Sequence, residues 1–140
     1  MAGSKPEGGC QCGAIRYRLD GPSERTNLCH CRMCQRAHGA PVVAWVTIRP
    51  DYVTMLGDAA TFFRSSPKAE RGFCGKCGSP LFWRLKDPSA SGEQPLTDVA
   101  AASLDDPTTL KPTEHIWLES AMPWLKLDDD LKRFPQERHS

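Results

Sequence analysis

Seven cysteines in three short clusters constrain this 140-residue chain more than any other feature of its sequence. The clusters are Cys10-Gln11-Cys12, Cys29-His30-Cys31-Arg32-Met33-Cys34 and Cys74-Gly75-Lys76-Cys77. An odd number of cysteines cannot pair fully within one chain, and clustered cysteines in a reducing compartment more often bind metal than form disulfides. Zinc holds thiolates tetrahedrally at about 2.3 Å, so neighbouring sulfurs must lie about 3.8 Å apart. Cys-x-x-Cys turns and extended Cys-x-Cys segments both allow that spacing, which predicts zinc binding.

The seven ligands divide naturally into four and three. The two-cysteine clusters, Cys10/Cys12 and Cys74/Cys77, predict a closed four-thiolate site, and closed sites of this kind are structural. Such a site would join the amino-terminal strand to a distant segment, and metal binding would then contribute to the free energy of folding. The cysteines of the middle cluster offer three thiolates from one loop and leave a position for water or substrate, as catalytic zinc sites do. This second set comprises Cys29, Cys31 and Cys34.

Two other arrangements satisfy the same spacing. In one, Cys10 and Cys12 share a metal with two cysteines of the middle cluster, and the last cluster binds elsewhere. In the other, all seven cysteines serve one or two purely structural zinc ions, and a histidine completes the second site. His30 and His38 are the candidates for that fourth ligand, although His30 lies between two ligands and should point away from the metal.

Short apolar runs separated by frequent turns predict a mainly β domain. The chain has 11 glycines and 12 prolines, and its 39% hydrophobic content allows a modest core. Residues 29–38 should form a loop leading into one helical turn, and residues 86–95 an exposed loop. A short helix is also expected at 108–110. Strands are expected at 15–19, 41–48, 52–55, 61–64, 81–85 and 114–119, while 98–103 fits strand or helix.

The charge pattern argues against several classes of partner. The formal net charge is +1, from 18 basic and 17 acidic residues, which gives no reason to expect a nucleic-acid partner. No apolar run is long enough to span a membrane, and the start of the chain lacks the apolar core of a secretory signal. We therefore expect a cytoplasmic protein without a membrane partner. Residues 1–7 should be a flexible segment, residues 8–127 the zinc domain, and residues 128–140 a loose, charged tail.

The cysteine clusters and their neighbours resemble the glutathione-dependent formaldehyde-activating family, also called the GFA or centromere protein V family. A weaker likeness continues at 102–107 and 115–117. The segments that carry the resemblance are Gly8-Gly9-Cys10-Gln11-Cys12-Gly13-Ala14-Ile15-Arg16-Tyr17, Cys29-His30-Cys31-Arg32-Met33-Cys34-Gln35-Arg36-Ala37-His38-Gly39-Ala40-Pro41 and Phe73-Cys74-Gly75-Lys76-Cys77-Gly78-Ser79-Pro80-Leu81.

The resemblance implies a β-tent fold of short antiparallel strands with one or two short helices. It also implies two zinc ions, a structural one on Cys10, Cys12, Cys74 and Cys77 and a catalytic one on Cys29, Cys31 and Cys34. The implied activity is that of a carbon–sulfur lyase, the addition of glutathione to formaldehyde to give S-(hydroxymethyl)glutathione. A small thiol and a small aldehyde would then be the partners.

The hypothesis that follows is a zinc enzyme in which a thiol substrate takes the open position and attacks an aldehyde. Three protein thiolates would blunt the acidity of the metal, and Arg32, Arg36 and a protonated His38 are the cations available to offset their charge. His115 is a candidate acid–base group, although a hydrogen-bonded structural histidine is the simpler interpretation. The competing class is a non-enzymatic zinc module that binds protein or nucleic acid. We assign no function to the four tryptophans or to Asp128-Asp129-Asp130.

Overall fold

The computed structural model describes residues 4–87 and 95–138, and within them the chain is mainly β. The α-helix is α1 (Arg32–His38), and single 3-10 turns are η1 (Pro50–Tyr52), η3 (Ala101–Ser103) and η4 (Leu118–Ser120). The strands are β1 (Glu7–Gly9), β2 (Arg16–Leu19), β3 (Arg25–Cys29), β4 (Val43–Ile48), β5 (Val53–Met55), β6 (Thr61–Arg64), β7 (Ala69–Phe73), β8 (Pro80–Leu85), β9 (Thr97–Ala100), β10 (Glu114–Ile116) and β11 (Lys132–Arg133).

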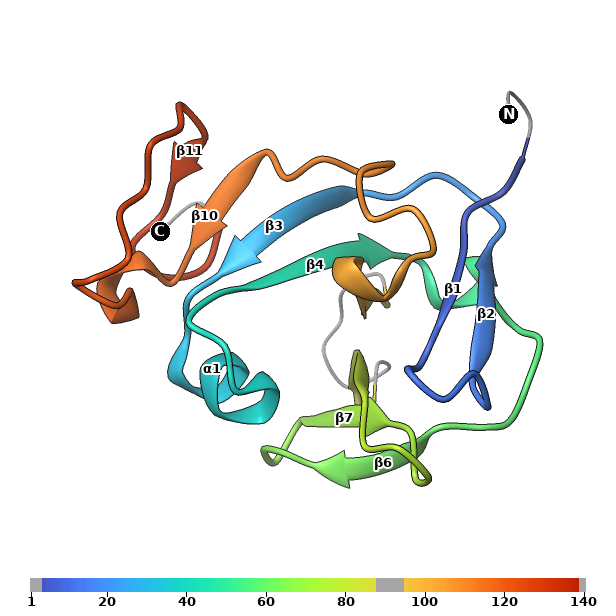
Figure 1. Ribbon diagram of the computed structural model, residues 1–140. Helices are drawn as coiled ribbons and strands as arrows, with labels where there is room; N and C mark the ends of the chain where they lie inside the picture. The colour runs from blue at the N-terminus through green and yellow to red at the C-terminus, as the bar shows by residue number, and fades with distance from the viewer. Residues whose placement is uncertain (1–3, 88–94, 139–140) are drawn as a thin grey trace.

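The strands form two sheets (Figure 1). The small sheet has the order β1-β2-β5, and the large sheet the order β11-β10-β3-β4-β9-β8-β7-β6. The pairings are antiparallel, as expected, except around β10, which runs parallel to both β3 and β11. Parallel neighbours need a long connection, and residues 117–131 provide it between β10 and β11.

Strand β4 is buried on both faces, which explains its nearly continuous apolar sequence. Val46 and Ile48 belong to the larger core, together with Tyr17 from the small sheet. Val43 and Trp45 point to the opposite face, where they pack with Cys29 and Cys34 in a second apolar cluster. The middle cysteine cluster therefore lies over one face of the large sheet, beneath α1.

The sequence patterns located most strands correctly, but the structure adds several elements. Strand β3 was not predicted, because Thr26 and Asn27 are polar yet buried and therefore conceal the alternation. Strands β1, β7 and β11 were also not predicted, and the helix expected at 108–110 is a turn. For residues 98–103 the sequence allowed either strand or helix, and the structure has one after the other: strand β9, followed by the single turn η3. The exposed loop expected at 86–95 falls largely outside the described residues.

The described residues near both ends of the chain are more tightly held than the sequence suggested. Within the segment 1–7, the carbonyl of Pro6 accepts a hydrogen bond from Leu19 N, and Glu7 begins β1. The expectation of a loose tail is corrected by β11, which pairs with β10, and by Phe134, which packs against the second apolar cluster. The domain boundaries at 8 and 127 remain predictions. Among the described residues no helix has the length and apolar character needed to cross a bilayer.

Candidate metal centre

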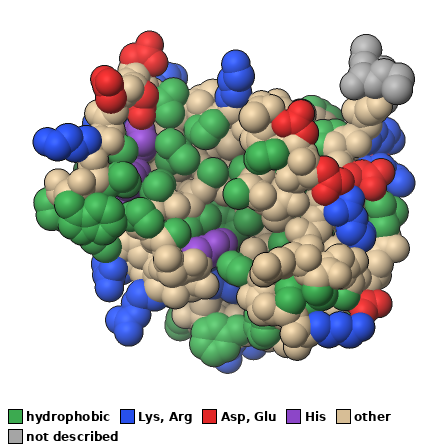
Figure 2. All heavy atoms as spheres, in the orientation of Figure 1, with side chains coloured by type: hydrophobic (Ala, Val, Ile, Leu, Met, Phe, Trp, Pro, Cys, Tyr) green, Lys and Arg blue, Asp and Glu red, His purple; other side chains and the backbone are tan. Residues whose placement is uncertain are grey.

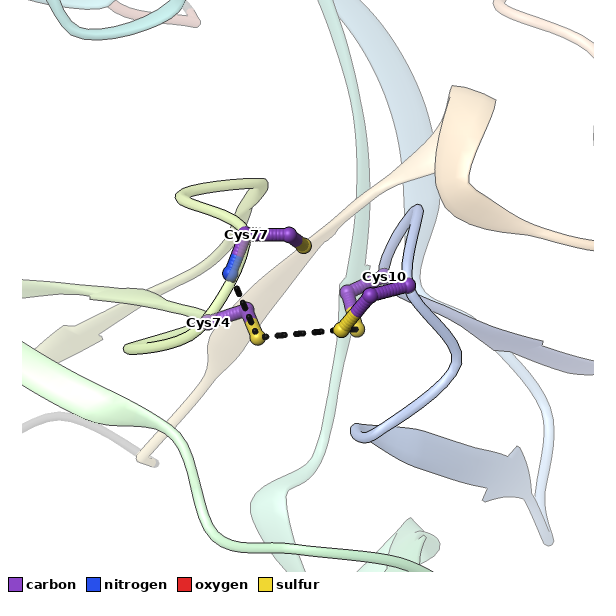
Figure 3. Close-up of side chains that lie close together, drawn as sticks. Cys10, Cys74 and Cys77 are labelled. Carbon is purple, nitrogen blue, oxygen red and sulfur yellow. Dashed lines mark hydrogen bonds between the residues drawn. The ribbon is translucent and has the colours of Figure 1, made fainter.

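The first group of sulfurs joins two turns that are far apart in the sequence. The Sγ atoms of Cys10, Cys12, Cys74 and Cys77 all lie within 4.8 Å of one another. Cys10 and Cys12 are 3.6 Å apart, and Cys12 and Cys74 are 3.8 Å apart. Figure 3 shows Cys10, from the turn after β1, facing Cys74 and Cys77, from the turn after β7. The spacing matches the edge of a zinc–thiolate tetrahedron, about 3.8 Å, so the donor set fits zinc.

Two glycines shape the turns that present these thiols. Gly13 and Gly78 have φ values of 83° and 79°, a region in which side chains are strained. Gly13 N donates to the carbonyl of Cys10, and Gly78 N donates to that of Cys74, which closes each turn. Substituting either glycine should therefore disturb the placement of a cysteine pair.

Backbone amides next to these sulfurs would offset thiolate charge. Ile15 N donates to Cys10 Sγ at 3.2 Å, and Lys76 N and Cys77 N each donate to Cys74 Sγ at 3.4 Å. Hydrogen bonds from Ser79 lower the pKa of Cys77 to about 5. At least one thiol of this group is therefore ionised at neutral pH, as metal binding requires.

The second group comes from one short stretch of chain. Cys29 ends β3, Cys31 is the N-cap of α1, and Cys34 lies in the first turn of that helix. Their Sγ atoms also lie within 4.8 Å of one another, and Cys31 Sγ accepts a hydrogen bond from Cys34 N at 3.3 Å. The structure therefore groups the seven sulfurs as four and three, and it does not bring Cys10 and Cys12 to the middle cluster.

No histidine joins this three-sulfur group among the described residues. The ring of His30 is fully buried and bonds to His115, so it is directed away from the sulfurs. His38 packs edge-on against Trp45, with ring centroids 5.1 Å apart. The geometry therefore does not support the alternative in which His30 or His38 is the fourth ligand of this site.

The sulfur of Cys34 receives side-chain N–H groups from two other elements. Trp45 Nε1 on β4 lies 3.4 Å away, and the Nη1 and Nη2 atoms of Arg71 on β7 lie 3.7 and 3.6 Å away. Sequence reasoning missed both residues, because the strand pairing that brings them to α1 is not visible in local patterns.

Arg71 supplies the positive charge that was expected from Arg32, Arg36 or a protonated His38. Arg32 instead donates to the side-chain oxygen of Gln35 at 2.6 Å. Burial lowers the pKa of His38, so a protonated His38 is disfavoured as the offsetting charge. Arg36 is exposed on the helix.

The three thiols of the second group cannot all ionise without a cation. The neighbouring sulfurs of Cys31 and Cys34, and then burial, raise the pKa of Cys29 far above its ordinary value. The same sulfur contacts lower the pKa of Cys31 to about 2, with a further contribution from Arg71. Close thiolates share their protons unless a metal neutralises them, so the chemistry of this donor set also fits zinc.

Residues 5–120 match the family described as glutathione-dependent formaldehyde-activating enzyme. The chain belongs to this family. A Halomonas elongata protein, provisionally named a glutathione-dependent formaldehyde-activating enzyme, is 28% identical over 133 residues, 87% of this chain and 80% of that protein. An uncharacterized lyase of Schizosaccharomyces pombe is 30% identical over 77 residues, 55% of this chain and 56% of the yeast protein.

A crystal structure of a Rhodobacter sphaeroides protein shares the fold of this member of the glutathione-dependent formaldehyde-activating enzyme family. Its TM-score is 0.55, at 21% sequence identity, and the match covers 71% of this chain and 88% of that one. At this level of identity the likeness supports the fold alone.

His115 has a structural role in this family member. Its Nδ1 lies 2.9 Å from Nε2 of His30, and its Nε2 lies 2.9 Å from the carboxylate of Asp129. Both rings are fully buried, and burial lowers the pKa of His30 to about 4. The buried, hydrogen-bonded ring favours the structural interpretation over the acid–base one. Asp129, to which no function was assigned, fixes the carboxy-terminal segment to this pair.

Asp98 is a titratable residue that the sequence did not indicate. It lies opposite Thr47 and Trp83 in the sheet, and Thr47 Oγ1 donates to its carboxyl at 2.5 Å. Burial raises the pKa of Asp98 to about 6, and the negative charge of Cys34 contributes to the same shift. A carboxyl with this pKa, near a thiolate group, exchanges protons close to neutral pH.

Proposed function

We propose that this chain is a zinc-dependent carbon–sulfur lyase-like enzyme that adds a thiol, glutathione being the candidate, to formaldehyde or a related aldehyde. The observation that carries the proposal is the three-sulfur group of Cys29, Cys31 and Cys34, which has no fourth protein ligand among the described residues. A second zinc, on Cys10, Cys12, Cys74 and Cys77, would be structural. We place the enzyme in the cytoplasm, where thiols stay reduced.

Zinc bound at the three-sulfur group would hold a substrate sulfur as thiolate and could polarise the aldehyde oxygen. The residues around it adjust how strongly Cys34 donates charge. Trp45 and Arg71 direct N–H groups at its sulfur, and hydrogen bonds to a thiolate withdraw charge from it. This answers the difficulty that three thiolates would blunt the acidity of the metal.

The reaction forms one carbon–sulfur bond, opens the carbonyl double bond, and transfers the thiol proton to the new hydroxyl oxygen. His38 is the chain's candidate for that transfer, because its half-buried ring lies beside Trp45 and its lowered pKa leaves a ring nitrogen free to accept a proton. Asp98 is farther along the same face of the sheet and would be the alternative proton donor.

The uncatalysed reaction requires a test at equilibrium. In mixtures of glutathione and ¹³C-formaldehyde, NMR exchange spectroscopy would measure interconversion of free and S-hydroxymethyl forms. We expect the exchange rate to rise in proportion to wild-type enzyme and to stay at the background rate with Cys31→Ser. Equal rates for the two proteins, both folded and with metal content measured, would contradict the proposal.

The non-enzymatic zinc module is the second class of function considered. Its nucleic-acid form is disfavoured by the net charge of +1 and by arginines that mostly pair with acidic side chains. A protein whose exchange rate equals the background in the NMR experiment would be assigned to this class.

A further inference from the structure

A cavity of about 430 Å³ is lined by residues of α1 and of the β6–β7 hairpin. Its lining includes Arg36 and His38 from the helix, Phe63 and Ser65 from the β6 side, and Arg71 from β7. Figure 2 shows that the face drawn is hollowed near its middle, where hydrophobic and histidine side chains lie close together. The volume falls within the range of small-molecule sites, about 300–1,000 Å³.

Arg71 connects this cavity to the three-sulfur group. Its guanidinium reaches Cys34 Sγ at 3.6 Å while the same side chain lines the cavity. Arg71 therefore belongs both to the cavity lining and to the surroundings of the sulfur cluster. The cavity is in the right place to hold the part of a substrate that does not react.

The ionisable side chains that line the cavity are all basic. Arg36, Arg71 and His38 are its ionisable residues, and no Asp or Glu lines it. Neither arginine forms an ion pair with a carboxylate among the described residues. Most other arginines of the chain do have such partners, for example Arg16, Arg18, Arg49, Arg84 and Arg138.

The remaining lining is apolar and partly open to solvent. Met33 is 46% exposed and Phe63 is 63% exposed, although both are large hydrophobic side chains. Together with the two arginines they favour a ligand that combines an anionic group with some apolar surface. Guanidinium groups recognise carboxylates through paired N–H donors.

We propose that this cavity binds a carboxylate of the thiol substrate, with Arg36 and Arg71 as the recognition residues. The inference rests on the proposed function and adds to it the residues that recognise the substrate away from its sulfur. Arg71 then has two roles, toward the Cys34 sulfur and toward the substrate carboxylate. An uncharged thiol of similar size would lack this anchor.

Binding of S-methylglutathione tests the proposal, because its blocked sulfur carries no thiol and its carboxylates are retained. Calorimetric titration of the zinc-loaded protein should show binding that weakens about tenfold when the probe is the diethyl ester, since charge-assisted hydrogen bonds are lost. Arg36→Gln should weaken binding of the acid by a similar factor and leave the ester unchanged. Arg64→Gln is the matched control, because Arg64 is exposed on β6, donates to the carbonyl of Pro67 and is not among the residues that line the cavity.

The outcomes separate this inference from the proposed function. Equal binding of acid and ester, equal loss of both in Arg36→Gln, or no binding of S-methylglutathione to the wild type would overturn the carboxylate pocket even if thiol exchange persists. Charge-dependent binding without exchange activity would support the pocket and contradict the lyase-like function.

Discussion

The guanidinium of Arg71 lies 3.6 Å from the sulfur of Cys34, although the two residues are 37 positions apart. The arginine lies on strand β7 of the large sheet, and the cysteine lies on helix α1. A positive charge beside a cluster of three thiols offsets the negative charge that metal binding leaves on them. The contact therefore links the fold of the sheet to the chemistry of the candidate catalytic site.

Arg71→Gln should make the metal of the three-sulfur group easier to remove. The substitution deletes the only guanidinium that contacts these sulfurs among the described residues, and hydrogen bonds to charged groups contribute about 1.5–3 kcal/mol. Zinc release to a colorimetric chelator should be about tenfold faster or more for one of the two ions. Arg64→Gln provides the control, and equal release from both variants would contradict this role.

The two cysteine groups should respond differently to single substitutions. Cys12→Ser removes a ligand that joins the β1–β2 turn to the β7–β8 turn, so the free energy of unfolding should fall by several kcal/mol. Cys31→Ser affects one local loop, so folding should persist while thiol exchange is lost. Urea denaturation together with zinc analysis measures both effects. Equal destabilisation by both substitutions would contradict the division into structural and catalytic sites.

Asp98 should make stability fall as the pH rises. Its pKa is about 6 in the folded chain against an ordinary value of 3.8, so the folded state binds more protons than the unfolded state between these values. The stability of wild type relative to Asp98→Asn should decrease by about 1–2 kcal/mol between pH 4.5 and 7.5. Asparagine keeps an acceptor for Thr47 but does not titrate.

Denaturation of both proteins across this pH range provides the measurement. Zinc loss at low pH affects the two proteins alike, so their difference isolates Asp98. The nearby charged groups, Arg25, Cys34 and Glu137, are also common to both. A difference that does not change with pH would rule out the raised pKa.

Asp129→Ala should loosen the carboxy-terminal segment. The carboxylate accepts a hydrogen bond from the buried Nε2 of His115, and leaving a buried polar atom unpaired costs about 1–3 kcal/mol. Amide hydrogen exchange should speed up in β10 and β11, and the midpoint of urea denaturation should fall. The neighbouring Asp130→Ala is the matched control. Identical exchange rates in the two variants would show that Asp129 does not hold this segment.

The sequence was informative about the sulfurs because ligand spacing is local. Each pair, such as Cys74 and Cys77, is fixed by a turn of four residues, and the number of ligands in each cluster led to the four-plus-three grouping. Strand β4 was equally clear, because burial on both faces leaves a continuous apolar run. The mainly β class followed from the same signals.

The sequence was silent where long-range pairing determines the geometry. Arg71 looks like any exposed arginine until β7 is placed beside β8, and Trp45 looks like any core tryptophan. The tail seemed free because its charges are typical of solvent-exposed segments, yet Asp129 satisfies a buried histidine. Strand β3 was hidden by polar residues whose burial depends on neighbours far along the chain.

Zinc K-edge X-ray absorption of the fully loaded protein, with and without glutathione, tests the central claim most directly. If the metal held by Cys29, Cys31 and Cys34 accepts a substrate thiol, the mean number of sulfur neighbours per zinc will rise from between three and four to four when glutathione is added. An unchanged sulfur count at saturating glutathione, in protein that contains two zinc ions per chain, would contradict the account.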